Sequence, residues 1–109
     1  MTEYIAYYQK NWGRFDELPD TMPVDDFLDG YAPVMFFMLS EQDLISNLDT
    51  IYYQMQGDKW SPHGEARELI KNSGLSHTSM SIGDIIYAKC NGNYYFVSGT
   101  GFQKVLLTN

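Results

Sequence analysis

Residues 55–102 read MQGDKWSPHGEARELIKNSGLSHTSMSIGDIIYAKCNGNYYFVSGTGF, and this stretch decides the fold. It is dense in residues that begin and end secondary structure: a Ser-Pro pair at 61–62, a glycine at 74 and an Asn-Gly pair at 91–92. Glycine at position 74 fits the left-handed cap that closes many helices. The Asn-Gly pair favours a type I′ hairpin turn, because both residues tolerate positive φ. The stretch therefore predicts a helix followed by a strand hairpin.

A first helix is predicted just before this stretch. Ser40 can cap its free amides, and Asp43 three residues later completes an approximate capping box. Apolar residues then recur at spacings of four, three and four, which places them on one helical face. They are Leu44, Leu48, Ile51 and Met55. Gly57 is predicted to end this helix.

A second helix is predicted to begin at Ser61-Pro62, since proline is tolerated at the first helical position, where an N–H would have no partner. Its apolar stripe consists of Ala66, Leu69 and Ile70, and Gly74 ends it.

Strands are predicted on both sides of the helices. Residues 85–88, 94–98 and 102–107 form three strands in succession, the first entered through Gly83-Asp84. The continuous apolar run at 32–39 predicts a strand buried on both faces, or nearly so. Residues 4–9 suit a strand or a short helix, and 24–28 one helical turn. The predicted fold class is α+β: two consecutive helices packed on a mainly antiparallel sheet of about four strands, in the order β-α-α-β-β-β.

A length of 109 residues indicates one domain. We expect an acidic, irregular N-terminal region over residues 1–31 and an α+β core over residues 32–109. The lone Cys90 excludes a disulfide within the chain and suits a reducing compartment. No secretory signal pattern and no apolar run of ~18 residues is present, so we expect a cytoplasmic protein that makes no membrane contact.

Charge is distributed unevenly along the chain. Residues 1–58 contain 11 acids and 2 bases, whereas residues 59–109 contain 3 acids and 5 bases. An acidic surface repels phosphate, which argues against direct nucleic-acid binding. It suits a basic partner protein or a nucleic-acid mimic that occupies a basic groove, although acidity also serves solubility alone. The candidate partner-binding residues are Asp16, Glu17, Asp20, Asp25, Asp26 and Asp29.

Three residues around position 80 contain the ingredients of a hydrolase site. His77, Ser79 and Ser81 lie on one side of a period-two segment, with Asp84 just beyond. A nucleophilic serine usually sits on a G-x-S-x-G elbow, which is absent here. We therefore expect these side chains to bond the loop between helix and strand, and we expect no catalytic residues.

Other site chemistries have weaker support. His63, His77 and Cys90 match no metal-binding spacing, so we expect neither a metal nor another cofactor. Aromatic strand residues at 87 and 94–96 could stack bases, but packing within the sheet is the favoured interpretation. A shell over residues 60–84 could bind a small ligand. Its candidate residues are Trp60, His63, Arg67, His77 and Thr78.

The stretch 55–102 resembles a pattern of small bacteriophage and mobile-element proteins, WSP-x-GEAR-x-LI followed by GL-x-HTSMS-x-GD. Its second half is similar to YodL-like domains, in which a serine-rich S-x-S segment leads into an aromatic strand and a Gly-Phe pair. The matching residues are Trp60, Ser61, Pro62, Gly64, Glu65, Ala66, Arg67, Leu69, Ile70, Gly74, Leu75, 77–81, Gly83, Asp84, Tyr94, Tyr95, Gly101 and Phe102. This resemblance implies a mobile-element origin and a function directed at a bacterial host, but no catalytic residues.

Together these features predict a non-enzymatic accessory protein that binds a host protein through its acidic surface, in counter-defence or host takeover. The alternative is a small ligand- or RNA-binding module that uses the shell at residues 60–84.

Overall fold

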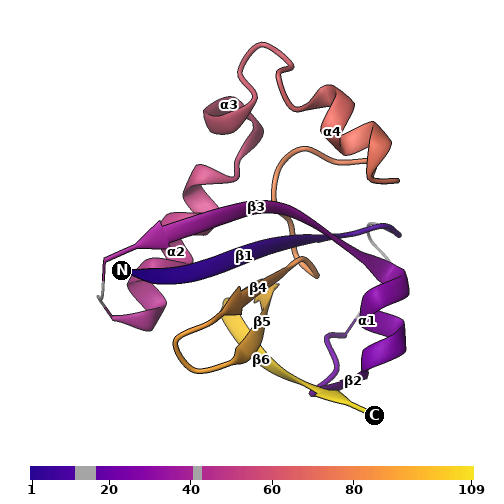
Figure 1. Cartoon of the computed structure of the whole chain (residues 1–109), viewed down its shortest axis with the longest axis vertical. Helices are drawn as coiled ribbons and strands as arrows, with labels where there is room; N and C mark the ends of the chain where they lie inside the picture. Colours follow the sequence, from indigo (N-terminus) through magenta and orange to yellow (C-terminus); the bar gives the residue numbers. More distant parts are fainter. Residues whose placement is uncertain (12–16, 41–42) are drawn as a thin grey trace.

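The aromatic segment near the start of the chain forms an interior strand of the sheet. The structure is a computed structural model that describes residues 1–11, 17–40 and 43–109. The strands are β1 (Thr2–Gln9), β2 (Thr21–Pro23), β3 (Tyr31–Leu39), β4 (Ile85–Ala88), β5 (Asn93–Ser98) and β6 (Gly101–Thr108). These described strands form one sheet in the order β2-β6-β5-β4-β1-β3 (Figure 1). Neighbours are antiparallel except β2 and β6, which run parallel.

Helices lie on both faces of this sheet. They are α1 (Val24–Gly30), α2 (Leu44–Gln54), α3 (Gly57–Trp60) and α4 (Arg67–Asn72). In Figure 1, α2 lies behind β1 and β3, whereas α1 lies near the end of the sheet where β2 is found. The predicted α+β class is confirmed. Within the described residues, however, the sheet has six strands instead of about four, and the helices number four instead of two.

Two hydrophobic cores lie on opposite faces of the sheet. Ile85 and Ile86 are adjacent in β4 and point to opposite faces, as strand geometry requires, and both are fully buried. Ile86 belongs to the core under α2, which includes Tyr4, Ala6, Tyr8, Leu48, Ile51, Met55 and Met80. Ile85 belongs to the core under α1, which consists of Met22, Phe27, Tyr31, Ile85, Phe96 and Val105.

The start of the chain belongs to this core, which corrects the expectation of an irregular region over residues 1–31. Strand β1 pairs with β3 on one side and with β4 on the other. Its residues Tyr4, Ala6 and Tyr8 are buried in the α2 core. Residues 21–30 are also regular, since they form β2 and α1.

Strand β3 is the apolar run that was predicted to be buried on both faces, or nearly so, and that prediction is wrong. β3 pairs only with β1 among the described strands and therefore forms one edge of the sheet. Phe36 and Met38 are 64% and 57% exposed on it. An absence of charged residues did not distinguish a buried strand from an edge strand here.

Helix α2 begins later than predicted. Its N-cap is Asp43, whose carboxylate accepts a hydrogen bond from the Ser46 amide at 3.2 Å. Ser40 instead lies before the helix, where its carbonyl accepts from the Asn47 side chain. The predicted apolar face is confirmed, because Leu48, Ile51 and Met55 are all fully buried.

The helix predicted from Ser61 also begins later, at Arg67. Residues 61–66 form turns instead, because local side chains hold their backbone. Ser61 Oγ accepts from the Ala66 amide at 2.9 Å, and the Glu65 carboxylate accepts from the His63 amide at 3.0 Å. The predicted end is confirmed: Gly74 has φ +73, and the Leu75 amide bonds back to the Ile70 carbonyl.

The hairpin between β4 and β5 has a different turn from the one predicted. Gly92 has φ +73, but Asn91 is not among the positive-φ residues, so the turn is not type I′. The Gly92 amide donates to the Ala88 carbonyl, and the Asn93 amide donates to the Asn91 side chain. Four residues, 89–92, therefore connect the two strands.

Candidate functional site

Asp84 is the centre of a buried hydrogen-bond network within the candidate shell at residues 60–84. It is fully buried at the point where the chain enters β4. Its carboxylate accepts from the Gln9 amide at 2.9 Å and from the Ser81 amide at 2.8 Å. His77 Nε2 lies 2.9 Å from Asp84 Oδ2. Asp84 therefore fastens the loop before β4 to the end of β1.

Burial raises the pKa of the Asp84 carboxyl above its ordinary value of 3.8. The hydrogen bond and the charge of His77, and then the amides of Gln9 and Ser81, act in the opposite direction but do not cancel the effect of burial. A buried carboxyl with an imidazole partner is a common feature of active sites, but also of structural networks.

Tyr8, Trp60 and Thr78 continue the network on the other side of His77. The rings of Tyr8 and His77 stack with centroids 4.7 Å apart. The Tyr8 hydroxyl donates to the Thr78 carbonyl at 2.7 Å, and Trp60 Nε1 donates to the same carbonyl at 3.0 Å. Burial and, to a smaller extent, the Asp84 charge raise the pKa of Tyr8, which keeps its hydroxyl a donor. Trp60, His77 and Thr78 thus hold the loop against β1.

Both serine hydroxyls form hydrogen bonds with backbone groups, that of Ser79 with the start of α3 and that of Ser81 within the loop. Ser79 Oγ accepts from the Gly57 amide at 2.8 Å, and Ser81 Oγ donates to the Ser79 carbonyl at 3.0 Å. These bonds follow the expectation that the hydroxyls bond the loop between helix and strand. The hydrolase interpretation gains no support from them.

His63 and Arg67, the other two shell residues, lie apart from this network and are exposed. Arg67 contributes with Thr78 to a second feature, an open pocket of about 290 Å³. This pocket is lined by Gly57, Ser61, Gly64, Arg67, Ile70 and Thr78. The structure therefore does not bring the five predicted shell residues together: Trp60, His77 and Thr78 belong to the network, Arg67 and Thr78 line the pocket, and His63 belongs to neither.

The acidic candidates gather on one short segment. Residues 17–30, which we call the acidic segment, pass through β2 and α1. Its acids Glu17, Asp20, Asp25, Asp26 and Asp29 are all exposed. Asp16 lies outside the described residues. Within the described parts of the chain, the ion pairs are His77 with Asp84 and Lys89 with Glu3, so the acidic segment contributes to neither.

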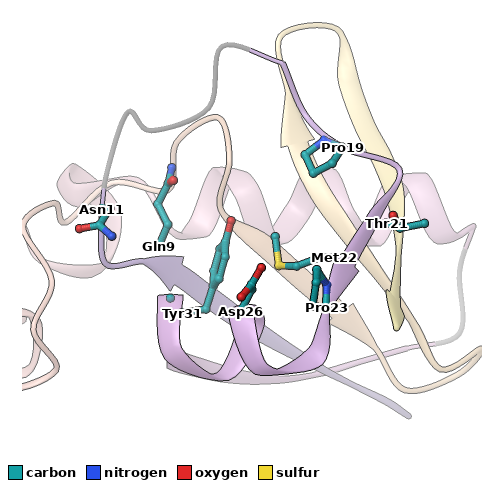
Figure 2. Close-up of a pocket in the computed structure, with 9 residues that line it drawn as sticks. Gln9, Asn11, Pro19, Thr21, Met22, Pro23, Asp26 and Tyr31 are labelled. Atoms are coloured by element: carbon teal, nitrogen blue, oxygen red, sulfur yellow. The ribbon is translucent and has the colours of Figure 1, made fainter. Parts of the chain in front are cut away.

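A pocket of about 170 Å³, the α1 pocket, opens beside this segment (Figure 2). In Figure 2, Gln9 and Tyr31 stand on one side of it, and Pro19 and Met22 on the other, with Asp26 below. The described lining includes no lysine or arginine. Ligand sites for drug-sized molecules usually measure ~300–1,000 Å³, so this pocket suits a single side chain rather than an organic cofactor.

Gln9 connects the α1 pocket to the buried network. Its side chain is 2% exposed, and Nε2 donates to the Ile82 carbonyl at 3.0 Å. No donor among the described residues reaches its other polar atom, Oε1. A buried acceptor without a partner costs ~1–3 kcal/mol. Reasoning from the sequence missed Tyr31, which directly follows the acidic segment, and it missed Gln9, which only the pairing of β1 with β3 brings beside Tyr31.

The aromatic strand residues that the sequence suggested as candidates pack against other side chains of the sheet. Tyr95 and Phe96 are buried in the two cores, whereas Tyr87 and Tyr94 pack on each other with centroids 4.7 Å apart. Across residues 1–11, 17–40 and 43–109, no three His, Cys, Asp or Glu side chains come together as metal ligands would. In the same ranges no helix has the length and apolar character that crossing a bilayer requires.

Comparisons with known protein families, curated proteins and solved structures found no match for this chain. Its function must therefore be argued from its own residues.

Proposed function

We propose that the chain is a non-enzymatic accessory protein of a phage or mobile element that binds a basic host protein through the acidic segment. The observation that carries this proposal is the state of the acids in α1. Asp25, Asp26 and Asp29 are exposed, and no ion pair holds them within the described structure. Their charges are therefore available to a partner.

Asp29 is poorly placed for the stability of α1, whereas Asp25 and Asp26 lie in the first turn, where the helix dipole favours negative charge. Asp25 and Asp29 are four residues apart on one helix, where like charges repel by ~0.2–0.5 kcal/mol. Asp29 also lies in the last turn, where the helix dipole disfavours a negative charge. A surface that served solubility alone could place its acids elsewhere at no such cost. This supports a role in binding.

A basic or nucleic-acid-binding host protein is the partner class that suits this charge. Neighbouring acids raise the association rate of a cationic partner and repel nucleic acid. The resemblance to mobile-element proteins makes counter-defence or host takeover the biological setting of the proposal, in the cytoplasm of a bacterium.

The test is affinity capture from bacterial lysate, followed by measurement of the purified complex by isothermal titration. Neutralising three acids together, as Asp25→Asn, Asp26→Asn and Asp29→Asn, should weaken the complex at least tenfold, at ~0.5–1 kcal/mol for each lost interaction. The matched control removes the same charge from other exposed acids, as Asp49→Asn, Asp58→Asn and Glu68→Gln. If both triple variants bind alike, net charge rather than the acidic segment attracts the partner and the proposal is wrong.

A ligand-binding module at residues 60–84 is a second candidate, favoured by the open pocket that Arg67 and Thr78 share. A guanidinium at a pocket wall recognises carboxylate or phosphate groups. Arg67→Ala should abolish binding of an anionic ligand while the melting temperature stays unchanged, since Arg67 is exposed. Unfolding of that variant would assign Arg67 to the fold instead.

A further inference from the structure

The α1 pocket combines features that point to a cation. Asp26 provides a carboxylate at its wall, and the described lining includes no positive charge that could neutralise it. Gln9 Oε1 provides a buried carbonyl oxygen that lacks a donor among the described residues. Carboxylate and carbonyl oxygens both accept hydrogen bonds, so an occupant must donate.

Turning the Gln9 side-chain amide does not satisfy its acceptor, because the exchange would break the hydrogen bond to Ile82. Nε2 donates to the Ile82 carbonyl at 3.0 Å, and exchanging the two ends would place oxygen against oxygen. The Gly83 backbone, where an added Cβ would lie 2.5 Å from Gln9 Nε2, also confines the side chain. Oε1 therefore stays fixed as an acceptor.

Apolar groups form much of the remaining pocket wall, beside the polar residues Asn11 and Thr21. Pro19, Met22 and the ring of Tyr31 contribute to its wall. Tyr31 is held in place, because its hydroxyl donates to the Gly83 carbonyl at 2.7 Å and its ring stacks on Phe27. An aliphatic stem can pack on such a wall, and a guanidinium can stack on an aromatic ring.

We infer that the α1 pocket receives one arginine side chain of the protein partner, an inference that rests on the proposed function. The guanidinium carries five N–H donors in a plane, enough for both the Asp26 carboxylate and Gln9 Oε1. A lysine ammonium is a compact, strongly hydrated charge with no flat face to stack. Arginine is therefore the residue that uses every wall of this pocket.

The experiment titrates the full chain with N-acetylarginine methylamide and follows amide signals by NMR. The signals of the Gln9 side chain and Tyr31 should shift, with Kd in the millimolar range. The citrulline analogue, which has the same shape without the charge, should not bind, and the lysine analogue should bind more weakly. Equal binding of citrulline, or equal binding of lysine, would overturn the inference.

Two single variants separate pocket recognition from general charge. Asp26→Asn should weaken the arginine analogue about tenfold, because a hydrogen bond to a charged group is lost. Asp25→Asn removes the same charge from the next residue, which does not line the pocket, and should change Kd less than about twofold. Equal losses in the two variants would overturn the inference.

The same variants in the partner complex show which proposal fails. Equal weakening by Asp25→Asn and Asp26→Asn would remove the arginine pocket but retain the acidic segment as the binding surface. Unchanged binding by the triple-neutral variant would remove both.

Discussion

Asp84 joins segments that lie far apart in the sequence. Its carboxylate accepts from the amides of Gln9 and Ser81 and faces His77, so the end of β1 and the loop before β4 share one acceptor. Because two backbone amides donate to this fully buried group, its loss leaves both amides without an acceptor.

Asp84→Asn is therefore expected to lower the free energy of unfolding by ~1–3 kcal/mol, since an amide NH₂ would face a backbone N–H that also donates. Urea denaturation measures the change. Asp49→Asn, at an exposed position in α2, is the matched control and should lie within ~0.5 kcal/mol of the wild type. An equal effect at both positions would contradict the role assigned to Asp84.

The raised pKa of Asp84 gives this contribution a pH dependence. Because burial raises the pKa above 3.8, the folded protein holds the proton more tightly than the unfolded chain. The stability from this group is complete below pH 3.8 and falls as the pH rises through the folded pKa. The wild-type advantage over Asp84→Asn should therefore shrink with rising pH in urea denaturations. An advantage that grows with pH would mean that His77 and the amides outweigh burial.

Single residues could be predicted where the signal is local. Gly74 ends α4 at positive φ as expected, because only nearby backbone determines that cap. The prediction of a type I′ turn with positive φ at Asn91 was wrong, because a four-residue connection between β4 and β5 does not require positive φ there. The buried position of Gln9 could not be predicted from the residues around it, because its environment depends on strands that are distant in sequence.

At the scale of elements, α2 provides a comparison of two isoleucines on different sides of one helix. Ile51 is fully buried in the core, whereas Ile45 is 49% exposed. Ile51→Ala should lower the free energy of unfolding by ~2–5 kcal/mol, because a cavity is left in the core. Ile45→Ala should change it by less than ~1 kcal/mol. Similar losses from the two variants in urea denaturation would contradict the assigned face of α2.

Helices were predicted well where an apolar pattern repeats along the sequence. They were predicted poorly where a single side chain determines whether the backbone forms a helix or a turn. The apolar spacing in α2 identified its buried face because four positions agree. The predicted start of the second helix at Ser61 was wrong, since Ser61 and Glu65 bond to nearby amides and hold turns. The edge position of β3 could not be predicted, because strand order depends on pairings between distant segments.

At the scale of the whole molecule, β1 lies between β3 and β4 and contributes three buried side chains to the α2 core. Deleting residues 1–9 should therefore abolish the cooperative urea transition, since β3 and β4 lose their common neighbour. Circular dichroism, recorded as urea is added, measures this transition. A variant without residues 1–9 that keeps a cooperative transition would support the original expectation of a separate core over residues 32–109.

The place of β1 in the sheet also has a consequence for synthesis on the ribosome. Thr2–Gln9 is made well before its partner β4, which begins at Ile85 and is followed by the β5–β6 hairpin. A nascent chain can pair β1 with β4 only after β4 has left the exit tunnel, and folds dominated by distant pairs form slowly. Until then the aromatic side of β1 is exposed to chaperones and to other nascent chains.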